Sequence, residues 1–360
     1  MRIVITGATG NVGTALLRRL QREAGLDLAG VVRRPPSDRA GAPYAGVEWH
    51  SVDVAGPDAV DALAKAFAGA DCVVHLAWQI QPSHDQAALR RANVGGSGAV
   101  IDAVLRAGVP ALVFASSVGV YAAGPKDRFV DESWPATGIA ASSYSRHKAT
   151  VEAMLDDVEA IHPELRIVRL RPGLIFQREA GAQIARYFLG PFVPVRLLRF
   201  GRIPIVPDHD RLRVQAVHAD DVADAYAKAI ASESAGPFNV AAPPVVTPHR
   251  IAARYHGITV PVPTALLRTA AAATWRARLQ PVDPGWVALA LGAPLMSSDR
   301  AHNEWNWTPS IDADQAIDDL IAGMAHHAHT DGPPLTGDPT RPGRLRGVLR
   351  GRVPGTGNPY

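Results

Sequence analysis

Two side chains that could move a proton together stand four residues apart. Tyr144 and Lys148 begin and end the stretch YSRHK, in a region whose pattern predicts a helix. Residues four apart lie on one face of a helix, one turn from each other. A lysine ammonium within about 4–6 Å favours a phenolate and lowers a tyrosine pKa from its usual value of about 10, so Tyr144 could act as general acid or base.

The alternative is a solvated helix face on which the spacing is accidental. Lysine is scarce, however, and occurs only at positions 65, 126, 148 and 228. Seven tyrosines and four lysines in 360 residues give roughly 0.08 pairs of this spacing by chance. One such pair is present, which favours the catalytic interpretation.

A glycine-rich turn, TGATGNVG at residues 6–13, follows the first predicted strand and opens a predicted helix. Gly7 permits a tight turn, Gly10 lets the backbone approach a pyrophosphate, and Gly13 lets the helix pack against the strand. The free N–H groups and the dipole of the helix start attract phosphate. The turn therefore predicts a dinucleotide site, whose residues here are Gly7, Thr9, Gly10, Asn11, Val12 and Gly13.

The end of the second strand bears on the choice of dinucleotide. An acidic residue at this point would bind the ribose hydroxyls of NAD, whereas an arginine suits the 2′-phosphate of NADP. The sequence has VVRRPP there, with Arg33 and Arg34. NADP is therefore favoured over NAD, and the alternative is that both arginines are merely solvated.

Further cofactor contacts are expected after the third and fourth strands. Asp53 and Val54 follow the third strand, and Asp53 would either accept a hydrogen bond from the adenine amino group or only form the turn before AGPD. Leu76 and Ala77 end the fourth strand, where the chain passes beneath the cofactor. His75, just before them, is interpreted as a core histidine without chemistry.

These residues need a parallel sheet to bring them together. In the first half, apolar runs alternate with helical patterns in the rhythm of strand–helix–strand units. The predicted strands are 2–6, 28–32, 47–52, 71–77, 110–116 and 165–170. Right-handed crossovers between buried strands predict an α/β fold, a doubly wound parallel Rossmann-type sheet with a smaller, mostly helical substrate lobe.

The expected domain division follows these patterns. Residues 1–175 form the dinucleotide-binding domain, to which 211–243 return, and 176–210 with 244–327 form the substrate lobe. Residues 328–360 are rich in Pro, Gly and Arg and predict a disordered basic tail. Such a tail is either simply solvated or touches an acidic partner.

Substrate specificity is expected from residues 78–85, 121–132 and 176–210. The last segment mixes apolar residues with arginines: Phe188, Phe192, Leu197, Leu198 and Phe200 beside Arg186, Arg196 and Arg199. It would form either an apolar substrate pocket with an anionic anchor, or an ordinary packing surface with its arginines in water.

Composition excludes several classes of protein. The single cysteine, Cys72, permits no intramolecular disulfide and no cysteine-rich metal site, and the histidines lack metal-site spacing. No apolar stretch reaches 18 residues and the chain starts directly with a strand, so a cytoplasmic protein without a membrane span is expected. From residue 331 on, five Arg and two Asp give +3, which equals the whole net charge, so the formally neutral body predicts no nucleic-acid partner.

Eight motifs in order carry a family resemblance: TGATGNVG, DV at 53–54, HLA at 75–77, NVGGS at 93–97, VFASSVGVYA at 113–122, YSRHK, LRPGLIF at 170–176 and VHADDVADA at 217–225. Together they resemble the extended short-chain dehydrogenase/reductase family, in its NAD-dependent epimerase/dehydratase group. The resemblance covers roughly residues 1–245 and is weaker beyond.

The resemblance implies roles for particular residues. The catalytic tyrosine and lysine fall on Tyr144 and Lys148, and the catalytic serine falls on Ser117, with Ser116 as the alternative. Tyr144 and Lys148 would also contact the cofactor, Lys148 through the nicotinamide ribose hydroxyls. Ser117, at the end of the fifth strand, would hydrogen-bond the substrate oxygen. Asn93 would support the active-site backbone and join a proton relay.

Pro172 and Gly173 match the turn whose backbone passes near the nicotinamide. Two segments depart from the resemblance: residues 176–195 and 213–217 lack the Asn-rich and Arg–Asp signatures of nucleotide-sugar epimerases. This departure weakens a nucleotide-sugar substrate.

The favoured function is an NAD(P)-dependent oxidoreductase that acts on a small-molecule hydroxyl or carbonyl carbon. The first alternative is an epimerase or dehydratase for a sugar-like substrate with tightly bound cofactor, and the second is a non-catalytic NADP sensor. The resemblance also implies a homodimer through helices 84–107 and 142–161.

Overall fold

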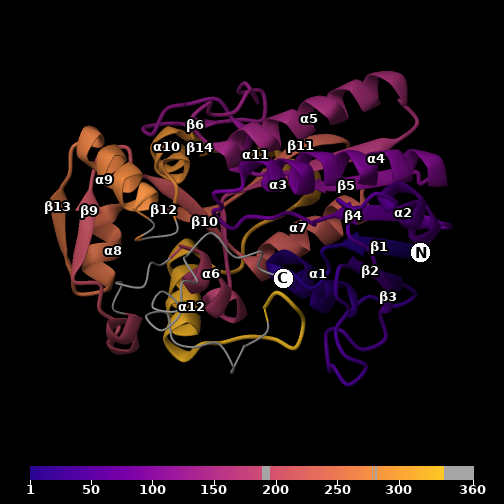
Figure 1. Cartoon of the computed structure of the whole chain (residues 1–360), viewed down its shortest axis with the longest axis horizontal. Helices are drawn as coiled ribbons and strands as arrows, with labels where there is room; N and C mark the ends of the chain where they lie inside the picture. The colour runs from indigo at the N-terminus through magenta and orange to yellow at the C-terminus, as the bar shows by residue number, and fades with distance from the viewer. Residues whose placement is uncertain (189–194, 278, 280–281, 336–360) are drawn as a thin grey trace.

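The computed structural model describes residues 1–188, 195–277, 279 and 282–335. Its largest feature is a seven-stranded parallel sheet with the order β11-β7-β5-β4-β1-β2-β3 (Figure 1). The strands are β1 (Arg2–Thr6), β2 (Asp27–Val32), β3 (Glu48–Ser51), β4 (Cys72–His75), β5 (Ala111–Ala115), β7 (Arg166–Pro172) and β11 (Gly236–Val240). The predicted α/β fold class, a doubly wound Rossmann-type sheet, is confirmed.

Strand side chains alternate between two apolar clusters, as the period of two requires. Ile3 and Ile5 of β1 pack with α1 (Asn11–Leu20) and α7 (Ala219–Ala231). Val4 packs on the opposite face with α2 (Ala59–Phe67), α4 (Gly96–Ala107) and α5 (Ser143–Ile161). Helices therefore cover both faces of the sheet (Figure 1), which explains why the inner strands β1, β4 and β5 are mostly apolar.

The direction of winding reverses at β1. The strands β2 and β3 lie on one side of it, and β4 and β5 lie on the other. At such a switch point the loops that leave neighbouring strands diverge and open a crevice at the carboxyl ends of the strands. The glycine-rich turn after β1 therefore faces this crevice.

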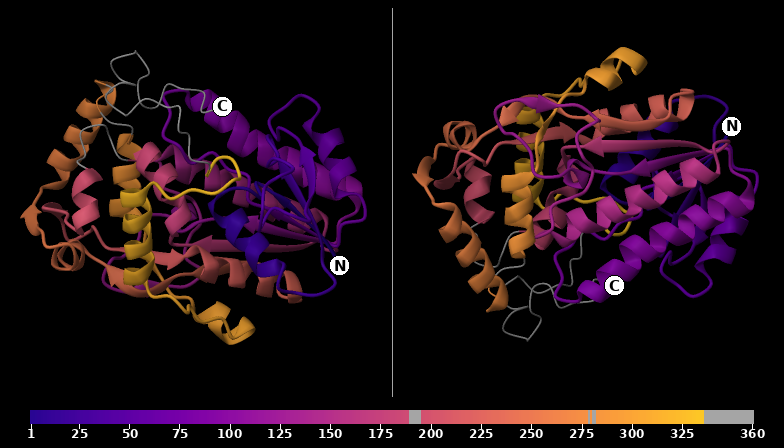
Figure 2. Two further views of the ribbon diagram at one scale, coloured as in Figure 1. Left: turned by 90° about the horizontal axis from the view of Figure 1, so that it is seen from below. Right: turned by 90° about the horizontal axis from the view of Figure 1, so that it is seen from above.

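The second half of the chain adds a smaller lobe at one end of the molecule (Figure 2). It holds a three-stranded sheet of β8 (Leu174–Phe176), β10 (Val214–His218) and β12 (Ala242–Val246), and a two-stranded sheet of β9 (Ile205–Asp208) and β13 (Ile258–Pro261). Its helices are α6 (Gly181–Phe188), α8 (Pro248–Arg254), α9 (Thr264–Arg276), α10 (Pro284–Gly292) and α12 (Ala313–His326). Short elements complete the chain: α3 (Gln86–Arg90), α11 (Asp299–Trp305), β6 (Phe129–Val130) and β14 (Leu295–Met296).

Two predicted segments differ from the structure. Residues 211–243 do not return to the main sheet as a unit, because β10 pairs with β8 and β12 in the lobe, whereas α7 and β11 join the main sheet. Residues 328–335 were expected to begin a disordered tail, but they pack against the body of the protein, with Leu335 only 1% exposed. The rest of the predicted tail, 336–360, lies outside the described residues.

A search of the described ranges for helices that could cross a bilayer found none of sufficient length and apolarity.

A buried carboxylate fastens the segment before α12 to the start of α7. Asp221 is 4% exposed and accepts hydrogen bonds from the Ser310 backbone N–H at 2.9 Å, the Ser310 hydroxyl at 2.7 Å and the Ile311 N–H at 3.0 Å. The Trp307 indole donates to the Asp221 carbonyl at 3.0 Å. One side chain thus fixes the path of the chain between the main sheet and α12.

We expect Asp221→Ala to lower the free energy of unfolding by about 2–4 kcal/mol, because three donors lose a buried charged acceptor. Asp220→Ala is the matched control, since the neighbouring side chain is 50% exposed and its ion-pair contacts are long, 4.0 Å to Arg18 and 3.7 Å to His218. Asp220→Ala should lower the free energy of unfolding by less than about 1 kcal/mol. Urea unfolding measures both values. Equal costs for the two variants would contradict this account of Asp221.

Candidate functional site

The turn after β1 forms a cradle that requires glycine. Gly7 has φ +70°, and a β-carbon there would lie 2.8 Å from the backbone of Ala77. A β-carbon on Gly13 would lie 2.5 Å from the carbonyl oxygens of Gly7 and Ala8. Both contacts are too short for carbon, so only glycine lets the start of α1 approach the end of β4 this closely. The geometry fits a dinucleotide pyrophosphate at the helix N-terminus.

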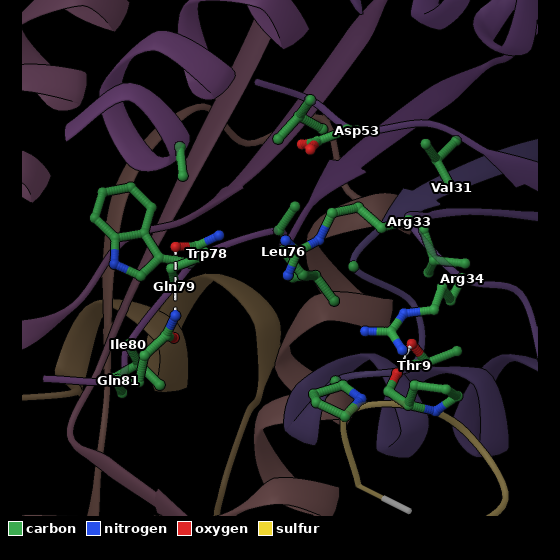
Figure 3. A pocket seen from close by; sticks show the side chains of 18 of the residues that line it. Thr9, Val31, Arg33, Arg34, Asp53, Leu76, Trp78, Gln79, Ile80 and Gln81 are labelled. Carbon is green, nitrogen blue, oxygen red and sulfur yellow. Dashed lines mark hydrogen bonds between the residues drawn. The ribbon is translucent and has the colours of Figure 1, made fainter. Parts of the chain in front are cut away.

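A groove runs from this turn across the carboxyl ends of β2, β3 and β4 (Figure 3). Most of the predicted cofactor residues line it: Gly7, Thr9, Gly10, Arg33, Arg34, Asp53, Val54, Leu76 and Ala77. Asn93 and residues 78–81 line it as well. Gln183 and Tyr187 of α6, which belong to the segment 176–210 expected to contact the substrate, line it too, and Pro333 and Pro334 add a contribution that the sequence did not predict.

Other predicted cofactor residues are absent from the groove lining among the described residues: Asn11, Val12, Gly13, Tyr144, Lys148, Pro172 and Gly173. The Asn11 amide donates to the Ile175 carbonyl at 3.1 Å and its oxygen accepts from Gln177 at 2.7 Å, so it joins α1 to the lobe. A β-carbon on Gly173 would lie 2.6 Å from the Gln215 carbonyl, so this glycine permits a close approach of two backbones.

The adenosine end of the groove is basic. Arg33 and Arg34 are exposed at the end of β2, and both appear among the side chains that line the groove in Figure 3. Asp53 lines the groove too, but its carboxylate accepts from the Ala55 N–H at 3.1 Å and its carbonyl accepts from the Gly56 N–H at 2.9 Å. Of the two roles expected for Asp53, the structure shows the turn-forming one.

Asn93 holds the chain that leaves β4. It is 2% exposed and lies in a single π-helical turn, Arg91–Gly95. Its side-chain oxygen accepts from the Gln79 N–H at 2.8 Å, and its amide donates to the Gln79 carbonyl at 3.0 Å. Turns of this kind are frequent at functional sites, and here both bonds position groove residues.

Ser117 and Tyr144 meet beyond the carboxyl end of β5. Both side chains lie beside Gly119, and the Ser117 hydroxyl accepts from the Gly119 N–H at 3.0 Å. A β-carbon on Gly119 would lie 2.8 Å from the Tyr144 ring, so this glycine makes room for the tyrosine. Sequence reasoning missed Gly119, although its place inside FASSVGVY was the available signal.

Lys148 lies one turn beyond Tyr144 on α5 and is 2% exposed. Its ammonium nitrogen donates to the Ala115 carbonyl at 2.5 Å and lies 3.5 Å from the centroid of the Trp78 indole. Burial lowers the pKa of Lys148 well below its ordinary value, and the charge of Glu152 opposes this effect. Trp78 also lines the groove, so it connects the groove with the Tyr144–Lys148 face.

The protonation of Tyr144 differs from the sequence expectation. Burial raises the pKa of Tyr144 to about 12, while the nearby Ser117 side chain acts in the opposite direction. Lys148 was expected to lower this pKa, but its nitrogen is directed at Ala115 and Trp78, and desolvation dominates the phenol. Tyr144 in this structure is therefore a neutral acid at pH 7.

Ser116, the alternative serine, belongs to a buried network instead. Its hydroxyl donates to Glu152, which accepts from Arg171 Nε at 2.9 Å. Arg171 also donates to the Tyr121 hydroxyl at 3.0 Å, which donates to Asn239 at 2.6 Å. Ser116 thus joins β5 to α5 and β7, while Ser117 faces Tyr144.

Aromatic rings surround Tyr144. The Trp286 ring lies 5.0 Å from it between centroids, and the Trp78 ring lies 6.1 Å away, edge-on. Phe188 of α6 packs against Trp286 at 5.0 Å. Among the described residues predicted to set specificity, Trp78 and Phe188 thus reach the site, whereas Phe200 is 75% exposed.

Two other residues of that segment make contacts with α12 or the end of that helix. Arg199 donates to the Ala325 carbonyl at 3.0 Å, and Leu198 packs beside α12. The side chains of Arg186, Phe192, Arg196 and Leu197 lie outside the described part of the chain.

Comparison with known proteins gives a family match. Residues 3–241 match the model of the NAD dependent epimerase/dehydratase family. An uncharacterized protein of Mycobacterium tuberculosis (strain ATCC 25618 / H37Rv) is 28% identical over 329 residues, which make up 90% of this chain but 30% of that protein. The chain thus spans less than a third of the length of this relative.

A 2-alkyl-3-oxoalkanoate reductase of Shewanella oneidensis is 28% identical over 230 residues, 62% of this chain and 55% of the relative. Among solved structures, UDP-glucose 4-epimerase of Thermus thermophilus in complex with NAD aligns with a TM-score of 0.66 and 21% identity. That alignment covers 90% of this chain and 99% of the other. At this identity the structural likeness supports the fold alone.

His75 is the core histidine that was predicted. It is 2% exposed, and its ring nitrogens contact the Thr6 hydroxyl at 2.7 Å and the Ser97 hydroxyl at 2.9 Å. Burial lowers the pKa of His75 to about 3, with a smaller contribution from the charge of Lys148. The ring therefore stays neutral beneath the groove.

This depressed pKa predicts acid sensitivity. The unfolded chain protonates His75 near pH 6.5, so its stabilising contribution is complete above that pH and is lost as the pH falls toward 3. Between pH 6 and pH 4 we expect the free energy of unfolding to fall by up to about 1.4 kcal/mol more per pH unit in the wild type than in His75→Gln. Urea unfolding at stepped pH measures the slopes, with the exposed His302→Gln as control. Equal slopes for wild type and His75→Gln would exclude this titration.

Proposed function

Because the chain belongs to the NAD-dependent epimerase/dehydratase family, we propose that it is an NAD(P)-dependent oxidoreductase that reduces an apolar ketone to an alcohol, or oxidises the alcohol. The observation that carries the proposal is that Ser117 and Tyr144 lie together beside Gly119, with Lys148 one turn along α5. The pair lies next to the groove because Trp78 contacts Tyr144 and Lys148 and also lines the groove.

The groove with its glycine-rich turn would hold a dihydronicotinamide cofactor, which would provide the hydride for the carbonyl carbon in the reducing direction. The Ser117 hydroxyl donates a hydrogen bond to the carbonyl oxygen and orients it. Tyr144 transfers its phenolic proton to that oxygen as the negative charge develops, and the product is the alcohol. Asn93 keeps the groove wall in place through its two bonds to Gln79.

The protonation state of Tyr144 supports the reducing direction. A phenol whose pKa is raised to about 12 carries its proton at neutral pH and is ready to act as the acid. Oxidation needs the phenolate, and within the site Ser117 is the group that favours it. A cationic nicotinamide would add to that effect.

The surroundings of Tyr144 support an apolar substrate. Trp78, Trp286 and Phe188 offer ring faces and edges, which suit a flat or aliphatic carbon skeleton. The name of the Shewanella oneidensis relative, a 2-alkyl-3-oxoalkanoate reductase, describes a ketone reductase. An epimerase of a sugar-like substrate is the competing function, and it would turn over without net change in absorbance at 340 nm.

The proposed acid is tested with NADPH and a panel of apolar ketones that includes 2-tetralone and 2-decanone. We expect Tyr144→Phe to lower kcat about 10²–10⁴-fold and Ser117→Ala to lower it about 10²–10³-fold, with little change in the Kd for NADPH. Ser116→Ala, the neighbouring control, should reduce stability while kcat falls less than about tenfold. Unchanged turnover in Tyr144→Phe would exclude the mechanism. Racemisation of the alcohol without net absorbance change would favour an epimerase.

For the cofactor, we propose NADP with Arg33 as a contact of the 2′-phosphate. Arg33→Asp should raise the KM for NADPH about tenfold or more and lower that for NADH, because a carboxylate repels the phosphate and accepts from the ribose hydroxyls. Arg39→Asp is the control, because Arg39 is also exposed. In this variant the ratio of the KM for NADPH to the KM for NADH should stay constant. A wild-type preference for NADH would contradict the assignment.

A further inference from the structure

The segment that follows α12 turns back across the molecule and closes on itself. The Thr330 N–H donates to the Leu335 carbonyl at 3.0 Å, and the Leu335 N–H donates to the Gly332 carbonyl at 2.9 Å. Leu335 is 1% exposed. We call residues 330–335 the carboxy-terminal strap; the bonds between its ends give it a defined shape although it contains no helix or strand.

Tyr44 anchors the strap to the main sheet domain. The Tyr44 hydroxyl bonds the Thr330 hydroxyl at 2.7 Å and the Thr14 hydroxyl of α1 at 3.0 Å. A β-carbon on Gly332 would lie 2.5 Å from the Tyr44 ring, so the strap backbone rests directly on the ring face. Tyr44 is 3% exposed and belongs to the apolar cluster behind α1, so the anchor is part of the core.

From this anchor the strap reaches the groove. The Pro333 carbonyl accepts a hydrogen bond from Thr9, which lies between Gly7 and Gly10 of the glycine-rich turn. Pro333 and Pro334 line the same groove as Arg33 and Arg34, and Figure 3 shows the end of the strap beside Thr9. The strap therefore stands at the adenosine end, where the turn after β1 and the end of β2 face each other.

We infer that the strap is the outer wall of the adenosine half of the cofactor site and that it retains the bound dinucleotide. Three features carry this inference: the bond to Thr9, the apolar proline rings on the groove side, and the rigid anchor at Tyr44 and Thr14. Proline contributes no backbone N–H that would need a partner at a site that excludes water. Because the wall is already ordered before the cofactor binds, less conformational entropy is lost on binding. We expect the gain in affinity to come mainly from slower dissociation of the cofactor.

The inference concerns cofactor affinity and does not depend on the reaction assigned to Tyr144. Its test is the binding of NADPH and NADH to the full chain, followed by tryptophan fluorescence and by stopped-flow displacement. The disrupting variant is Gly332→Val, which forces the strap off Tyr44 without altering a groove residue. Gly41→Val is the matched control, because a β-carbon at Gly41 meets nothing within 4 Å.

We expect Gly332→Val to raise the Kd about tenfold, chiefly through faster dissociation, while Gly41→Val stays within about twofold. A chain that ends at His329 should show the same loss, whereas a chain that ends at Leu335 should bind like the full chain. The melting temperature without cofactor shows whether each variant is folded. An unchanged or tighter Kd in Gly332→Val would overturn the inference, and so would an equal loss in the chain that ends at Leu335.

Discussion

The groove depends on the close contact between the backbone of Gly7 and the backbone of Ala77. The turn lies between the central strand β1 and the start of α1, so any side chain there would push the helix away from β4. The same turn carries Thr9 outward to the carboxy-terminal strap. Three parts of the groove therefore share one constraint: the helix start, the end of β4 and the wall formed by the strap.

A second constraint lies beneath the proposed catalytic pair. Glu152 of α5 accepts from Arg171 of β7 and from Ser116 after β5, and these side chains are buried. A buried ion pair contributes less to stability than to geometry, but the loss of one partner leaves an unpaired charge and is costly. The network fixes the helix relative to the strand end, and this is what brings Ser117 within reach of Tyr144.

Periodicity and glycine spacing predicted the sheet and most of the groove, because buried parallel strands and tight turns restrict the residues that can occupy them. The strap could not be predicted in this way. Its Pro- and Gly-rich composition is typical of disorder, and its order comes from partners far away in sequence, Tyr44 and Thr9. The contacts of the Lys148 ammonium could not be predicted either. Helical spacing places Lys148 on the same face as Tyr144, but it does not show that the ammonium contacts the Ala115 carbonyl and the Trp78 ring. The sequence of β10 is typical of a strand of the main sheet. Its place in the lobe is seen only from its pairing with β8 and β12.

The bond between Thr9 and Pro333 joins residues 324 positions apart. Chains grow at about 5–20 residues per second, so the ribosome adds Pro333 tens of seconds after Thr9. The glycine-rich turn can fold early with β1 and α1, but the wall opposite it is absent until the strap has emerged. Cofactor capture in its final, slowly exchanging form therefore has to wait until the strap has been synthesised, and a chain that terminates before the strap keeps an open cofactor site.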